Sequence, residues 1–119
     1  MTAMDARLNL VVDQIRAASA SATALRIRGG GSKDFLGALP AGELLDTRPL
    51  SGIVSYEPSE LVVTVRAGTP LTELEAVLAE RGQCLAFEPP HFGAPGAATV
   101  GGMVAAGLSG PARASVGGV

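Results

Sequence analysis

Three consecutive glycines at positions 29–31 restrict the fold of this chain more than any other feature. They follow an apolar stretch that ends in Arg28, and they precede Ser32 and Lys33. Because none of the three glycines has a Cβ, the backbone there is free to take positive φ angles and to approach another group closely. Successive N–H groups in such a turn converge into a nest that binds anions. With two cations and a hydroxyl beside it, the turn is predicted to bind a phosphate or pyrophosphate.

Two common phosphate-binding motifs do not match this segment. The spacing Gly-x-Gly-x-x-Gly fails because position 34 is Asp, and no Gly stands five positions before a Gly-Lys-Ser/Thr triplet. A Gly-Gly-Gly-Ser run is also typical of a flexible linker. An anion-binding turn and a linker are therefore both open interpretations of the segment taken alone.

The composition indicates a globular protein and excludes several classes. The 119 residues fit one domain or a piece of one, with 47% hydrophobic and 17% charged residues. The net charge of −2 and the scattered aromatic residues argue against nucleic acid as a partner. The stretch 89–112 has no charged residue, but its prolines leave no run of the ~20 residues that a membrane span needs.

Single cysteine and histidine residues limit the chemistry available to this chain. Cys84 has no cysteine partner for a disulfide, which fits a reducing cytoplasm, and it is predicted to be a small core residue. His91 is the only histidine, so neither a metal site nor a His-dependent triad is supported. It is expected in a loop, beside a ligand or in solvent. The acidic residues suggest no catalytic pair, so the catalytic residues are unknown.

Hydrophobic spacing predicts alternating helices and strands. Helices are expected over 5–19, 70–81 and 101–106, and strands over 24–28, 43–46, 52–55, 61–66 and 84–87. Thr69 is expected to cap the helix that follows it, with Pro70 at the first helical position and Gly82 in the left-handed conformation after its end. The strand, helix and strand between 61 and 87 are predicted to form a βαβ unit with a right-handed crossover.

A second glycine-rich segment begins after Pro90. The helix expected over 101–106 opens with Gly101 and Gly102, where no Cβ obstructs an approach. The start of a helix carries partial positive charge, so this segment is a second candidate phosphate site. A glycine-rich loop that packs tightly against its own protein is the alternative.

The order of these motifs resembles the N-terminal part of the FAD-binding domain of the vanillyl-alcohol oxidase/p-cresol methylhydroxylase (PCMH) superfamily. Within it, the chain is similar to the FAD-binding subunits of bacterial glycolate oxidases. The segments that carry the resemblance are 25–35, 45–48, 52–58, 67–71, 85–93 and 99–111. The implied fold is α+β, a small mixed sheet with the βαβ unit and flanking helices. Residues 1–23 would form an N-terminal helix and residues 24–119 the first, incomplete part of the PCMH-type domain, in a fragment or a shortened gene product.

The resemblance also implies that both glycine-rich segments contact FAD. The first segment would contribute Arg28, Gly29, Gly30, Gly31, Ser32 and Lys33. The second would contribute Pro89, Pro90, Gly93, Thr99, Val100, Gly101, Gly102, Gly107, Ser109 and Gly110. Several members of the superfamily carry a histidine that links covalently to the flavin. Ser32 occupies that position here, which implies non-covalent FAD.

The implied activity is FAD-dependent oxidation of the CH–OH group of a 2-hydroxy acid such as glycolate, with the flavin supplying the chemistry. The implied partners are a second flavoprotein subunit, an iron–sulfur subunit and the small 2-hydroxy acid, in the cytoplasm or peripheral to the inner membrane through those subunits. Alternatives are a non-catalytic assembly or electron-relay subunit, a D-lactate-type oxidoreductase, and a reductase of a UDP-sugar enol ether. The isolated chain is expected to be inactive and to aggregate or need partners.

Overall fold

Helices and short strands alternate in the computed structural model, which describes residues 2–38, 40–111 and 113–118. In chain order the elements are α1 (Ala3–Ala20), β1 (Leu25–Arg28), β2 (Glu43–Asp46), β3 (Ile53–Glu57), the 3-10 helix η1 (Pro58–Glu60), β4 (Val62–Val65), α2 (Leu71–Ala79), α3 (Val100–Ala106) and α4 (Arg113–Val116). This mixture of helices with small sheets confirms the predicted α+β class. Residues 1 and 119, the outer limits of the predicted domain division, lie outside the described residues.

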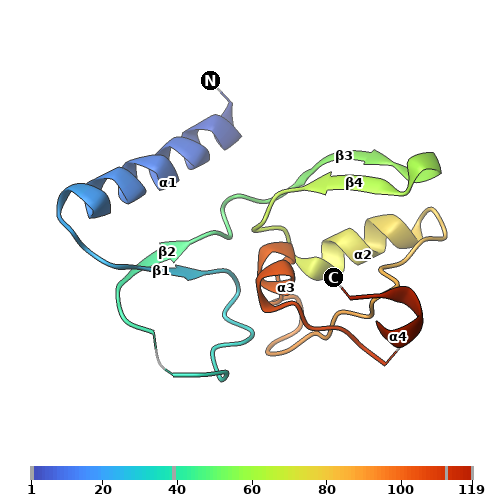
Figure 1. Cartoon of the computed structure of the whole chain (residues 1–119). Coiled ribbons are helices and arrows are strands. Elements are labelled where there is room, and N and C mark those ends of the chain that lie inside the picture. Colours follow the sequence, from blue (N-terminus) through green and yellow to red (C-terminus); the bar gives the residue numbers. More distant parts are fainter. Residues whose placement is uncertain (1, 39, 112, 119) are drawn as a thin grey trace.

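Helix α1 lies beside the parallel pair β1–β2 in the first part of the chain (Figure 1). The helix begins with a capping box, in which Thr2 and Asp5 each accept the other's backbone N–H. The Gln14 side chain ties the helix to the sheet, because its Nε2 donates to the Leu44 carbonyl at 2.7 Å. The helix expected over 5–19 and the strands expected over 24–28 and 43–46 are confirmed.

The antiparallel pair β3–β4 and helices α2 and α3 surround the main core in the second part of the chain (Figure 1). The buried core residues are Leu71, Leu74, Leu78, Ala98, Val100 and Met103. Partly buried residues of the β3–β4 pair, such as Val63 and Val65, pack against them. This core fixes α3, so the second glycine-rich segment is held in place by apolar packing.

The predicted strand at 84–87 is absent from the described structure, and the βαβ prediction was wrong. The strands form two separate two-stranded sheets instead of one mixed sheet. After α2, the Gln83 side chain donates to the Pro58 carbonyl at 2.9 Å and accepts a hydrogen bond from the Tyr56 hydroxyl. The backbone then turns, with the Glu88 N–H donating to the Leu85 carbonyl and Glu88 at φ 51°. A left-handed residue at the end of a turn does not continue a strand.

Three smaller predictions for this region were also wrong. Thr69 does not cap α2, because its Oγ1 accepts the Gly52 N–H at 2.9 Å and donates to the Gly52 carbonyl at 3.2 Å. Pro70 is the N-cap residue instead of the first helical residue. Cys84 is exposed, since the segment after α2 does not enter a sheet. The left-handed conformation predicted for Gly82 is confirmed, at φ +66°.

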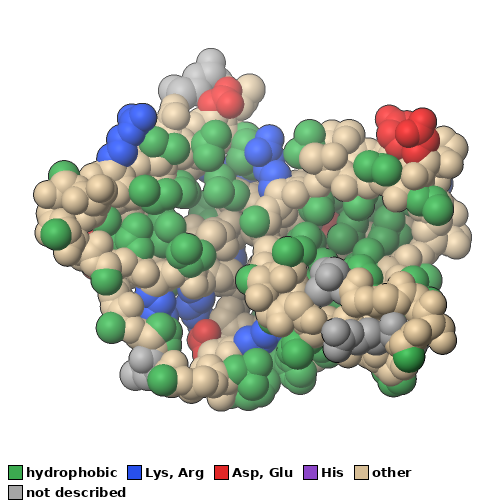
Figure 2. All heavy atoms as spheres, in the orientation of Figure 1, with side chains coloured by type: hydrophobic (Ala, Val, Ile, Leu, Met, Phe, Trp, Pro, Cys, Tyr) green, Lys and Arg blue, Asp and Glu red, His purple; other side chains and the backbone are tan. Residues whose placement is uncertain are grey.

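Large hydrophobic side chains remain exposed along α1 (Figure 2). Leu10 is 71% exposed, and Leu8 and Ile15 are each 45% exposed. Among the helices of the described ranges, none combines the length and apolar character required to traverse a bilayer.

Candidate functional site

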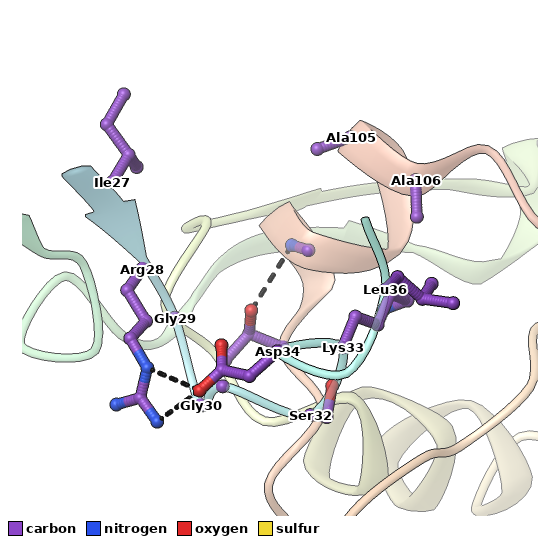
Figure 3. A pocket seen from close by; sticks show the side chains of 13 residues that line it. Ile27, Arg28, Gly29, Gly30, Ser32, Lys33, Asp34, Leu36, Ala105 and Ala106 are labelled. Atoms are coloured by element: carbon purple, nitrogen blue, oxygen red, sulfur yellow. Dashed lines mark hydrogen bonds and ion pairs between the residues drawn. The ribbon is translucent and has the colours of Figure 1, made fainter. Parts of the chain in front are cut away.

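A hollow of about 350 Å³ lies between the glycine turn that follows β1 and helix α3 (Figure 3). Its lining residues are Ile27, Arg28, Gly29, Gly30, Gly31, Ser32, Lys33, Asp34, Leu36, Thr99, Gly102, Ala105 and Ala106. Its volume is within the range of about 300–1,000 Å³ typical of small-molecule sites. The two glycine-rich segments that sequence analysis singled out therefore meet at one hollow.

The two segments are in close contact on either side of this hollow. A Cβ on Gly29 would lie 2.6 Å from Thr99 Oγ1, and a Cβ on Gly30 would lie 1.6 Å from the Ala97 carbonyl oxygen. Real Cβ atoms do not come within 3.0 Å of such neighbours. The turn is thus packed against the rest of the chain, which a flexible linker would not be.

The glycine turn has hydrogen-bond donors to offer a ligand. Across the residues that the structure describes, no hydrogen bond takes the N–H of any residue from Gly29 to Lys33 as its donor. The buried Ser32, 8% exposed, adds a hydroxyl to the same lining. Backbone N–H groups and a hydroxyl are the donors from which anion-binding nests are built.

The two cations of the turn have different surroundings. Arg28 Nε and Nη2 donate to Asp34 Oδ2 at 3.1 and 2.8 Å (Figure 3). These hydrogen bonds hold the pKa of the Asp34 carboxyl below its usual range and raise the pKa of the Arg28 guanidinium. Lys33, the only lysine in the sequence, forms no ion pair with any described residue.

Helix α3 shapes the hollow but has few donors to offer. The N–H groups of its first residues, Val100 and Gly101, donate to the carbonyls of Thr69 and Ala67 at 2.9 and 2.8 Å. The Gly102 N–H donates to Thr99 Oγ1 at 3.2 Å. The anion site predicted at the start of this helix therefore has these N–H groups already paired within the protein.

The other predicted site residues lie at several places. Gly93 is next to the turn, because a Cβ there would be 3.1 Å from the Ser32 Cα. Pro89 lines a different hollow of about 560 Å³, together with His91 and Glu75, whose Nε2 and Oε1 atoms are hydrogen-bonded at 2.7 Å. Pro90, beside it, is half-buried.

The remaining predicted residues lie in α3 or in the segment that follows it, and they do not line the first hollow. Val100 belongs to the core, and Gly101 is in close contact with Ala67. Gly107 ends α3 in the left-handed conformation. The Gly110 N–H donates to the Phe87 carbonyl at 2.8 Å. The buried Ser109 Oγ has no hydrogen-bond partner within the described part of the chain.

Sequence reasoning did not identify five residues of the first hollow: Ile27, Asp34, Leu36, Ala105 and Ala106. For Ala105 and Ala106 a signal was present, because small residues three and four positions after Gly102 lie on the same helix face. In the described ranges, no group of three or more His, Cys, Asp or Glu side chains could hold a metal ion.

Two comparisons with known proteins gave matches to this chain. A family model described as "FAD binding domain" matches residues 8–119. The glycolate oxidase subunit GlcE of Escherichia coli (strain K12) is 50% identical over 103 residues, which make up 87% of this chain and 29% of that protein. The chain thus spans less than a third of the length of that relative. No solved structure matches the chain significantly.

Proposed function

Since this chain belongs to the FAD-binding domain family, we propose that it holds FAD non-covalently, with the cofactor's pyrophosphate in the hollow beside the glycine turn. FAD itself, the cofactor predicted from the sequence, is confirmed by membership of the family. One observation carries the location. Residues 29–33 line the same hollow, and their backbone N–H groups have no acceptor among the described residues.

The residues that line this hollow are suited to bind a diphosphate. Hydrogen bonds from N–H groups to a charged acceptor contribute roughly 1.5–3 kcal/mol each, and an ammonium adds Coulombic attraction. On the opposite wall, Gly102, Ala105 and Ala106 are small and leave room for the group. No histidine lies in the turn, and Ser32 does not form the covalent bond that a histidine forms in some flavoproteins, so the proposed binding is non-covalent.

We further propose that the protein oxidises a 2-hydroxy acid such as glycolate, as part of a complex with a second flavoprotein subunit and an iron–sulfur subunit in the cytoplasm. The name of the E. coli relative, a glycolate oxidase subunit, supports this activity. When bound, FAD would accept the electrons removed from the substrate. The role of this chain is to bind and orient the cofactor, and none of its described residues is assigned to catalysis.

A second candidate function is assembly or electron relay without catalysis. The exposed apolar side chains of α1, with Leu10 at 71% exposure, favour it because such surfaces often mark contacts with other proteins. If the role is assembly, Lys33→Met would leave intact both co-purification with the partner subunits and oxidation of the hydroxy acid by the complex.

The experiment is flavin extraction from the whole protein that carries this chain. Acid precipitation is expected to release FAD into the supernatant, because the proposed binding is non-covalent. A covalently bound flavin would remain in the pellet with the protein. Lys33→Met is expected to lower the FAD content, whereas the matched variant Arg81→Met, two residues after the end of α2, keeps it. Protein without FAD after reconstitution would refute the binding proposal. Glycolate-dependent reduction of an artificial electron-acceptor dye then tests the activity separately.

A further inference from the structure

We propose that Arg28 and Lys33 have different roles toward the cofactor: Lys33 pairs with the diphosphate, whereas Arg28 is a positioning residue that shapes the glycine turn through Asp34. The identity of the ligand rests on the proposed function. The assignment of Arg28 rests on the geometry of the turn alone.

Arg28 is embedded in the turn that it precedes. Its guanidinium lies beside Gly31, where a Cβ would be 2.0 Å from Arg28 Nη2. The same guanidinium makes two hydrogen bonds to the Asp34 carboxylate. The backbone closes the same stretch, because the Asp34 N–H donates to the Gly31 carbonyl at 3.2 Å. Arg28 and Asp34 therefore join the two ends of the segment that contains the unused N–H groups.

The ion pair between Arg28 and Asp34 also determines which positive charge is available to a ligand. A guanidinium bonded to a carboxylate presents little net charge at a distance, since the opposite charges offset each other. Lys33 has no such partner among the described residues. Its Nζ lies 3.9 Å from the point where a Cβ on Gly102 would be, so the ammonium extends across the hollow to the α3 wall.

The alternative is that Arg28 leaves Asp34 and binds the phosphates itself. The two arrangements make opposite predictions for Asp34→Asn. If Asp34 competes with the ligand for Arg28, the variant frees a cation and FAD binds more tightly. If Asp34 holds Arg28 in place, FAD affinity falls slightly or stays the same.

The test is FAD titration of the whole protein by flavin fluorescence at several salt concentrations, for wild type, Lys33→Met, Arg28→Gln, Asp34→Asn and the Arg28→Gln/Asp34→Asn double variant. Lys33→Met is expected to weaken binding by about 10- to 100-fold and to flatten its salt dependence. Arg28→Gln and Asp34→Asn are expected to keep the wild-type salt dependence, and the double variant to bind no worse than the weaker single variant. Tighter binding by Asp34→Asn, or a flattened salt dependence in Arg28→Gln, would overturn the assignment.

Two controls separate this inference from the proposed function. If the wild type does not bind FAD, titration with inorganic pyrophosphate still tests Lys33, and an affinity unchanged by Lys33→Met would refute its role. Thermal unfolding of the wild type, Arg28→Gln, Asp34→Asn and the double variant tests Arg28 without any ligand. Additive effects of Arg28→Gln and Asp34→Asn on the unfolding free energy would show that the two residues do not act together.

Discussion

Gly29 and Thr99 lie far apart in the sequence, yet a Cβ on Gly29 would be 2.6 Å from Thr99 Oγ1. The same oxygen accepts the Gly102 N–H and so caps α3. The Thr99 hydroxyl therefore lies against the glycine turn and also caps α3. Any side chain at position 29 has to displace the cap.

Gly29→Ala is expected to destabilise the protein by about 1–3 kcal/mol, the usual effect of extra atoms in a packed site, and to weaken FAD binding. Urea unfolding measures the first effect and flavin titration the second. Thr99→Ala provides the control, because it removes the two atoms nearest to the added methyl group. Gly29→Ala should then lower the unfolding free energy less in the Thr99→Ala background than in the wild type. Equal losses in the two backgrounds would contradict the contact between positions 29 and 99.

Leu74→Ala tests the core that holds α2 against α3. Leu74 is 2% exposed, so its truncation leaves a cavity and is expected to cost about 2–5 kcal/mol of unfolding free energy. Val104→Ala, on the exposed side of α3 with 59% of the residue accessible, is expected to change stability by less than about 0.5 kcal/mol. Similar losses in the two variants would show that the core is placed incorrectly.

The acid stability of the chain is expected to depend on Asp46. The hydrogen bond from Arg48, 2.7 Å between Nη2 and Oδ2, holds the pKa of the Asp46 carboxyl below its ordinary value of 3.8. A depressed native pKa means that the stabilisation is fully present above the ordinary value and is lost as the pH falls through the native one. Asp46→Asn should therefore flatten the dependence of Tm on pH in the acid range, as followed by circular dichroism. Identical profiles for the variant and the wild type would count against the ion pair.

The isolated chain of 119 residues is expected to self-associate, because α1 exposes the side chains of Leu8, Leu10 and Ile15. Leu10→Glu should reduce that association without loss of helix content, since Leu10 is 71% exposed. Size-exclusion chromatography with light scattering gives the mass. A monomeric wild-type chain with a sharp, ligand-free melt would contradict the prediction.

Local sequence patterns were sufficient for most elements and for the two glycine-rich segments that line the first hollow. The strand at 43–46 was predicted with the bounds that the structure has, and the glycines at 29–31 were predicted to form a turn with close contacts. Both follow from short-range chemistry: turn-forming residues such as Pro49 after the strand and missing Cβ atoms in the glycine turn.

Features that depend on distant side chains could not be predicted. The Gln83 side chain hydrogen-bonds to the distant Pro58 carbonyl, and Thr69 bonds to Gly52 instead of capping α2. The different surroundings of Arg28 and Lys33 depend on how the turn folds back onto Asp34. In each case a side chain has several possible partners, and only the three-dimensional arrangement selects one.

The glycine turn is also the first part of the connection between β1 and β2, which pair in parallel. Parallel neighbours need a long connection, and here that connection carries the N–H groups that we propose bind the diphosphate. Occupancy of the hollow and pairing of these two strands are therefore linked equilibria, in which ligand binding strengthens the pairing. The amide protons of β1 and β2 should exchange with solvent more slowly once the cofactor is loaded, which makes this small sheet an internal reporter of occupancy.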